Sequence, residues 1–110
     1  MNKEIKEKWL CALRGGKYKQ GRNVLKKKNE KGEIEYCCLG VLCDIYLKNN
    51  NGKWVQGMSY SCEGRQNTLP NGVKDWSNFD DFRKEERLIN QNDTKKENFK
   101  TIANWIEKNL

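Results

Sequence analysis

The chain has 110 residues, 35% of them hydrophobic and 34% charged, and its formal net charge is +7. This length predicts a single ligand-binding domain of residues 1–110 with a core of modest size. No apolar run approaches the ~18 residues of a membrane span, so we expect no contact with a membrane. The charge-rich first eight residues lack the apolar core of a secretory signal peptide.

The positive charge is concentrated near the start of the chain. Residues 1–28 hold ten Lys and Arg against two Glu, a net charge of +8, whereas residues 29–110 have a net charge of −1. This concentration of positive charge favours the binding of an anionic partner. Nucleic acid, a nucleotide and a merely solvated lysine-rich face all remain open.

The first half of the chain predicts two helices joined by short extended segments. Asn2 is a candidate cap for a helix that runs to about Leu13 and is ended by Gly15-Gly16. A second helix is expected from about Cys38 to Leu47. Between these helices we expect a polar loop or short strand over Lys17–Leu25, a hairpin turn over Lys26–Gly32 and a returning strand over Glu33–Tyr36.

The second half contains weaker signals. Phe99, Ile102, Ala103 and Ile106 have helical spacing and predict a last helix preceded by Asn92-Asp93-Thr94. Before it we expect a strand over Lys53–Gln56, a long loop over Gly57–Thr68, a short helix or turn from Leu69, a charged segment over Asp80–Arg87 and a short strand at Leu88-Ile89. The predicted fold class is α+β, with a small antiparallel sheet, N-terminal and C-terminal helices and a short central helix.

Cys37–Asp44 forms a nearly continuous apolar segment at the turn from a strand into a helix. We expect it to be buried, either as a simple core helix or with its first N–H groups facing a pocket that attracts phosphate. The five cysteines favour buried free thiols in a reducing compartment. Structural zinc on Cys37, Cys38, Cys43 and Cys62 is the alternative, but the chain lacks a C-x-x-C pair and histidine. We expect no metal and no cofactor.

The chemistry-bearing residues favour a binding protein over an enzyme. Histidine, a serine nucleophile motif, a Walker loop and a G-x-G-x-x-G loop are all absent from the sequence. Phe82 stands alone among charged residues, where it either anchors a loop to the core or stacks on a base. Asn92 and Asp93 either cap the last helix or contact an adenine edge.

A basic aromatic cluster follows the first helix. Arg14 and its neighbouring lysines combine phosphate pairing with the ring of Tyr18, and Gln20 adds an amide. The alternative is a basic surface loop in which Tyr18 packs on the core.

Four segments together resemble a family of small phage and prophage proteins. They are Trp9–Gly21 (WLCALRGGKYKQG), Tyr36–Asp44 (YCCLGVLCD), Leu69-Pro70 with Val73 and Trp76, and Asn92-Asp93 followed by Phe99–Ile106. The family is the Thoeris anti-defence family, in its first-described type, a sponge for cyclic ADP-ribose signals.

This resemblance implies an anti-defence protein in the host bacterial cytoplasm. Such proteins bind nucleotide signals made by bacterial TIR enzymes, here a cyclic ADP-ribose isomer such as glycocyclic ADP-ribose, and sequester them without cleavage. The resemblance also implies a homo-oligomer, a dimer or trimer of dimers, with a separate site for cyclic di- or trinucleotides. It assigns Phe82 and Asn92 to the ligand pocket, and the surroundings of Arg14, Tyr18 and Gln20 match the family pattern.

Three other functions stay open at this stage. A nucleic-acid-binding regulator would use the basic N-terminal segment and lose affinity steeply with salt. A protein inhibitor of a host defence enzyme would need no small ligand. A small nucleotide hydrolase would return its ligand cleaved.

Overall fold

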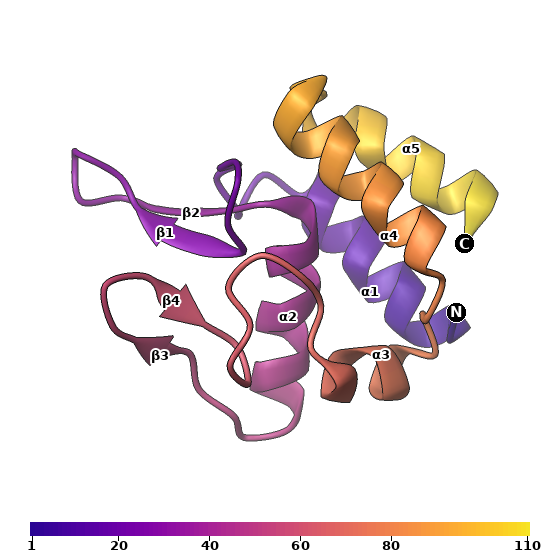
Figure 1. Cartoon of the computed structure of the whole chain (residues 1–110). Helices are drawn as coiled ribbons and strands as arrows, with labels where there is room; N and C mark the ends of the chain where they lie inside the picture. Colours follow the sequence, from indigo (N-terminus) through magenta and orange to yellow (C-terminus); the bar gives the residue numbers. More distant parts are fainter.

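The computed structural model describes residues 1–110 and has an α+β fold, as the sequence predicts (Figure 1). The helices are α1 (Lys3–Arg14), α2 (Cys38–Asn49), α3 (Asn71–Ser77), α4 (Phe82–Ile89), the π-helical turn η1 (Asn90–Thr94) and α5 (Phe99–Asn109). The strands are β1 (Lys26–Lys28), β2 (Ile34–Tyr36), β3 (Val55–Gln56) and β4 (Tyr60–Ser61). None of the helices is both long enough and apolar enough to cross a membrane.

The first helix forms as its sequence pattern predicts. The side chain of Asn2 caps α1 by accepting a hydrogen bond from the N–H of Ile5 (3.0 Å). The apolar side of α1 is buried against α2 and α5. Within this contact the indole N–H of Trp9 donates to the carbonyl of Cys38 (2.9 Å), which ties α1 to the start of α2.

Helix α2 is the centre of the core. Every residue from Cys38 to Asp44 is buried, as expected for this apolar segment. The loop before β1 crosses the first turn of α2 at Leu25, which is completely buried. Gly40 permits this crossing, because a Cβ atom there would overlap with the carbonyl oxygen of Leu25 and lie 2.7 Å from its carbonyl carbon.

The strands form two small hairpins instead of the single sheet that was predicted. β1 pairs antiparallel with β2, with Lys27 opposite Glu35, and β3 pairs antiparallel with β4. The prediction of an uninterrupted loop over Gly57–Thr68 is therefore wrong, since β4 lies within it. The hairpins project side by side from the helical part of the molecule (Figure 1). A two-residue strand such as β4 leaves too short a pattern to recognise from sequence.

The segment from Asp80 to Asn98 differs most from the prediction. Leu88-Ile89 is the end of α4, not a strand, and Phe82 begins that helix. Asp81 caps α4 by accepting from the N–H of Lys84 (3.1 Å). The helical path continues directly into η1, and α5 begins anew after Asn98, whose side chain accepts from the N–H of Thr101.

Candidate ligand-binding site

Asn92 lies at the centre of a buried polar junction between η1, α2 and the loop before β1. Its side chain is completely buried. The Oδ1 atom accepts from the side-chain amide of Gln20 (2.8 Å) and from the N–H of Cys38 (3.2 Å). The Nδ2 atom donates to the carbonyl of Gly21 (2.9 Å) and to Oδ1 of Asp93 (2.8 Å). The two donors and two acceptor positions of this amide are therefore all used within the chain.

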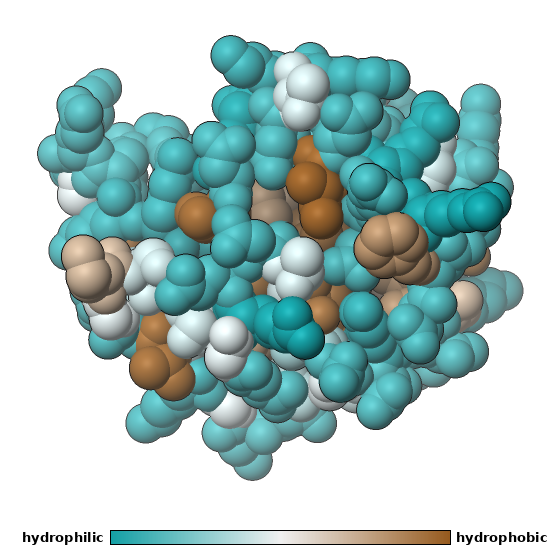
Figure 2. Space-filling view, in the orientation of Figure 1, coloured by the Kyte–Doolittle hydropathy of each residue, from teal (hydrophilic) through white to brown (hydrophobic).

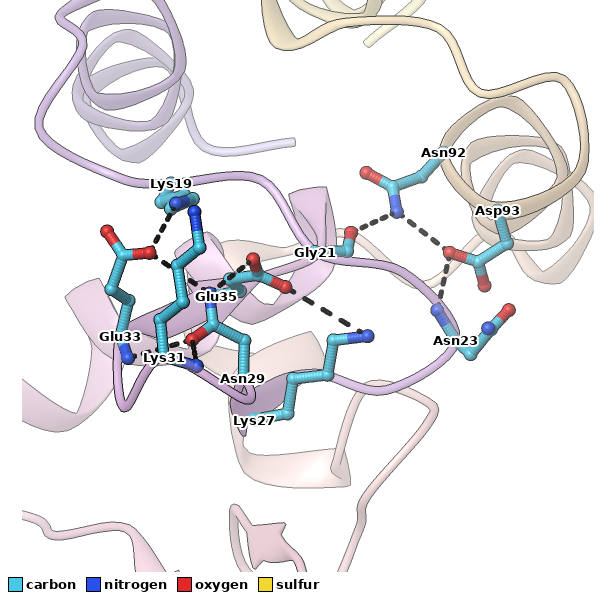
Figure 3. Close-up of polar contacts among 10 residues, drawn as sticks. All are labelled: Lys19, Gly21, Asn23, Lys27, Asn29, Lys31, Glu33, Glu35, Asn92 and Asp93. Carbon is cyan, nitrogen blue, oxygen red and sulfur yellow. Dashed lines mark hydrogen bonds and ion pairs between the residues drawn. The ribbon is translucent and has the colours of Figure 1, made fainter.

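Gln20 and Asp93 extend this junction toward the surface. The amide of Gln20 also donates to the carbonyl of Glu97 (2.8 Å), and Asp93 Oδ1 accepts from the N–H of Asn23 (2.9 Å). Figure 3 shows Asn92 and Asp93 meeting the loop at Gly21 and Asn23. The structure thus brings together three residues of the predicted site, Gln20, Asn92 and Asp93, and joins them by hydrogen bonds to one another and to the loop backbone.

Two sequence interpretations of this region are wrong. Neither Asn92 nor Asp93 caps the last helix, because Asn98 does so. The first N–H groups of α2 do not face a pocket either: that of Cys38 donates to Asn92, and that of Gly40 donates to the sulfur of Cys37 (3.3 Å). The end of α2 that was expected to attract phosphate is covered by η1.

Arg14 and Tyr18 lie outside this junction. Arg14 bonds to Glu107 (2.9 Å) and to the side chain of Asn104 (2.9 Å), and so fastens α1 to α5. The hydroxyl of Tyr18 donates to the buried carboxylate of Asp44, which also accepts from the indole N–H of Trp54 (3.0 Å). Both residues have structural partners, and the structure does not bring them together with Asn92 or with Phe82.

Asp44 anchors an aromatic cluster that the sequence analysis did not identify. Burial raises the pKa of its carboxyl group, but hydrogen bonds from Tyr18, Trp54 and Lys48 outweigh burial and hold the pKa below its usual value. Beside it, the Nζ atom of Lys26 lies over the ring of Tyr60, 4.5 Å from the centroid. These contacts join the two hairpins to α2.

Part of the positive charge of residues 1–28 is neutralised by ion pairs in the folded chain. Lys19 pairs with Glu33 at 2.8 Å and Lys27 with Glu35 at 4.0 Å, both within the polar network of the first hairpin (Figure 3). Arg14 pairs with Glu107, as described above. Three of the ten cations of residues 1–28 are thus paired with carboxylates, whereas the other seven form no ion pair within the chain.

Phe82 is the exposed aromatic residue of the predicted site. Its exposed fraction is 73%, so the interpretation as a core anchor is wrong. Phe79 has that role: it is 3% exposed, and its ring centroid lies 6.2 Å from that of Trp9. Phe82 is left free to contact a ligand.

A groove of about 300 Å³ lies beside Phe82. Its other lining residues are Arg65, Thr68, Lys74, Glu85, Glu86 and Ile89. In Figure 2 this side of the molecule is mostly hydrophilic, with its hydrophobic residues in small separate patches, one of them in a hollow beside α4. An aromatic face, a hydroxyl group, two cations and two carboxylates are thus gathered at one groove.

Backbone and side-chain hydrogen bonds position the groove residues. Arg65 ends a tight turn in which Cys62 and Arg65 exchange two backbone hydrogen bonds of 2.8 and 2.9 Å. Glu85 is buried and accepts from the N–H of Leu69 (2.9 Å), and its other carboxylate oxygen lies 3.6 Å from Nζ of Lys74. Sequence reasoning missed Arg65, Lys74 and Glu85. A cap at Asp81 followed by Glu85 and Leu88 on one helical face is the signal that could have indicated Glu85.

The cysteines are free thiols, four of them buried and Cys11 exposed. The expectation of burial is confirmed for those four and wrong for Cys11. Burial raises the pKa of the Cys37 thiol to about 12, so this thiol stays protonated near neutral pH. No three His, Cys, Asp or Glu side chains lie close enough together to hold a metal ion.

Excess EDTA is expected to leave the melting temperature unchanged, because the buried thiols are not grouped with enough other ligands to hold a metal ion. A thermal melt with and without chelator measures this. Loss of structure together with the release of one zinc ion per chain would show that the cysteines are metal ligands.

The geometry described so far defines a small α+β protein with a polar junction at η1 and a groove beside α4. The whole chain, residues 1–110, matches the family described as "Domain of unknown function (DUF8296)", and the chain belongs to that family. No match was found among curated proteins or among solved structures.

Proposed function

We propose that this protein binds a cyclic ADP-ribose isomer, such as glycocyclic ADP-ribose, and sequesters it without cleavage. In a phage-infected bacterium this would remove the signal made by TIR enzymes and keep the defence effector inactive. The observation that carries the proposal is Phe82, an exposed ring beside a groove that also contains the unpaired cation Arg65. The resemblance of four sequence segments to Thoeris anti-defence proteins supplies the ligand class.

The chemistry of the groove suits such a ligand. A cyclic ADP-ribose isomer presents an adenine, two riboses and a pyrophosphate. The ring of Phe82 offers a stacking face for the base. Arg65, which forms no ion pair within the chain, offers positive charge, and the hydroxyl of Thr68 offers a hydrogen bond to a ribose.

Sequestration without cleavage is supported by the state of Glu85, the buried one of the two carboxylates in the groove lining. Glu85 already accepts a backbone hydrogen bond from Leu69 and faces Lys74. Both oxygens of this carboxylate are thus engaged within the chain, Glu86 is the other carboxylate of the groove, and the sequence has no histidine to act as a general base.

We also propose a homo-oligomer as the functional unit, acting in the host bacterial cytoplasm. A groove of about 300 Å³ is at the lower limit of small-molecule sites, so a second subunit would close it more completely. Trp105 on α5 is half-buried, and the part of its side chain that neither the core nor Arg87 covers offers apolar surface for such a contact. Cyclic di- or trinucleotides would then bind at a separate site of a higher assembly.

Replacing Phe82 by alanine is expected to weaken the binding of glycocyclic ADP-ribose by roughly 5- to 150-fold, from the loss of a stack worth ~1–3 kcal/mol. Isothermal titration calorimetry measures the change. The melting temperature should not fall, because the ring is mostly exposed.

Two control variants belong to this experiment. Phe82→Tyr keeps the stacking face and should bind like the parent protein. Met58→Ala removes another exposed apolar side chain, which is not part of the groove lining, and should also bind normally. Unchanged affinity in Phe82→Ala would remove this residue from the site.

A further inference from the structure

A second groove lies along the other side of α4. Its volume is about 510 Å³, and it shares Glu86 and Ile89 with the groove beside Phe82. The two grooves therefore adjoin across the exposed side of one helix. Its remaining lining residues are Arg83, Arg87, Asn90, Thr94 and Lys95.

The helical repeat explains why these side chains gather. Arg83, Arg87, Asn90 and Thr94 follow one another at spacings of four, three and four residues, which place them in one stripe. The stripe runs without a break because α4 continues directly into η1. Lys95 follows at the end of η1. Two guanidinium groups, an amide, a hydroxyl and an ammonium group thus face one groove.

The cations of this groove are not neutralised by carboxylates of the chain. Arg83, Arg87 and Lys95 form no ion pair with any carboxylate of the chain, whereas Glu86 is the one acidic residue in the lining. Arg87 is held by a different contact: its guanidinium carbon lies 5.3 Å from the ring centroid of Trp105. Stacking on a ring orients a guanidinium group and leaves its N–H groups free to donate.

We propose that the groove formed by Arg83, Arg87 and Lys95 binds the pyrophosphate of the nucleotide ligand, while Phe82 stacks on its base. This inference rests on the proposed function. Guanidinium groups match phosphate oxygens with paired N–H donors, and a free cluster of them favours a diphosphate over a single carboxylate. Phe82 and Arg83 are consecutive residues on adjacent sides of α4, so one compact nucleotide reaches both.

The test uses the double variant R83Q/K95Q of the full chain. Both side chains are exposed and without partners in the chain, so the melting temperature should stay that of the parent. The control variant K28Q/K31Q removes the same charge at exposed positions of the first hairpin. Calorimetry with glycocyclic ADP-ribose gives the affinities, and inorganic pyrophosphate is added as a competitor.

We expect R83Q/K95Q to bind glycocyclic ADP-ribose about 10- to 100-fold more weakly, and K28Q/K31Q to bind it like the parent. Pyrophosphate should compete with the ligand on the parent protein and lose this effect on R83Q/K95Q. If the parent binds the ligand and R83Q/K95Q binds it equally well, or if both variants weaken equally, the groove assignment is overturned and the proposed function stands. A parent protein that binds no cyclic ADP-ribose isomer overturns the proposed function itself.

Discussion

Gly40→Ala is expected to destabilise the protein by roughly 3 kcal/mol or more, because the new methyl group would overlap with the backbone of Leu25. The obstacle is a backbone carbonyl of a buried segment, which also accepts from the N–H of Cys37 (3.2 Å) and cannot move aside freely. Helix propensity alone would favour alanine by about 1 kcal/mol. The expected sign is therefore opposite to that of an ordinary glycine inside a helix.

Thermal unfolding followed by circular dichroism measures this effect, and a fall of more than about 10 °C is expected. Gly57→Ala is the matched control, since a Cβ there meets only the carbonyl oxygen of Ser59, at an ordinary distance of 3.7 Å. If Gly40→Ala melts at the same temperature as the parent, Leu25 does not cross α2 as the structure has it.

Asn92→Ala is the second change with a large expected effect, about 3 kcal/mol of stability or more. The substitution leaves the N–H of Cys38 and the carbonyl of Gly21 without their partners in the interior. An unsatisfied buried group of this kind costs about 1–3 kcal/mol, and here there are at least two. The protein should melt more than about 10 °C lower than the parent.

Asn71→Ala is the control for this variant, because the side chain of Asn71 is exposed and lies outside the lining of both grooves. Hydrogen exchange adds a local readout: the N–H of Cys38 should exchange faster once Asn92 no longer accepts from it. A normal melting temperature combined with a lower affinity for ligand would instead make Asn92 a direct ligand contact. A direct contact between Asn92 and a ligand stays a prediction.

The local sequence pattern was sufficient to predict the three long helices, α1, α2 and α5. In α1 and α5 the apolar residues recur at helical spacing, and Asn2 marks the start of the first. Helix α4 was missed because its inner side contains Glu85, whose burial depends on Leu69 and Lys74 far away in the sequence. A carboxylate in a core position has no apolar signature, so a local pattern cannot indicate it.

The candidate site was only partly predictable for the same reason. Phe82 could be identified because an aromatic residue among charges has few local roles. Asn92 could be identified as an amide of interest, but its bond to Gln20 joins residues 72 positions apart and is invisible in the sequence. Arg65 reaches the groove through a turn whose geometry depends on the backbone pairing of Cys62. The type of a residue therefore suggests what it could bind, whereas its contacts with residues distant in the sequence are seen only in the folded structure.

The most direct test of the central claim is to incubate the protein with the signal generated by a TIR enzyme, remove unbound material, denature the protein by heat and analyse the released molecule by mass spectrometry. Our account predicts the release of an intact cyclic ADP-ribose isomer in near-stoichiometric amount. Release of linear ADP-ribose alone would make the protein a hydrolase. Release of no nucleotide would contradict sequestration and favour an inhibitor that acts on protein or nucleic acid.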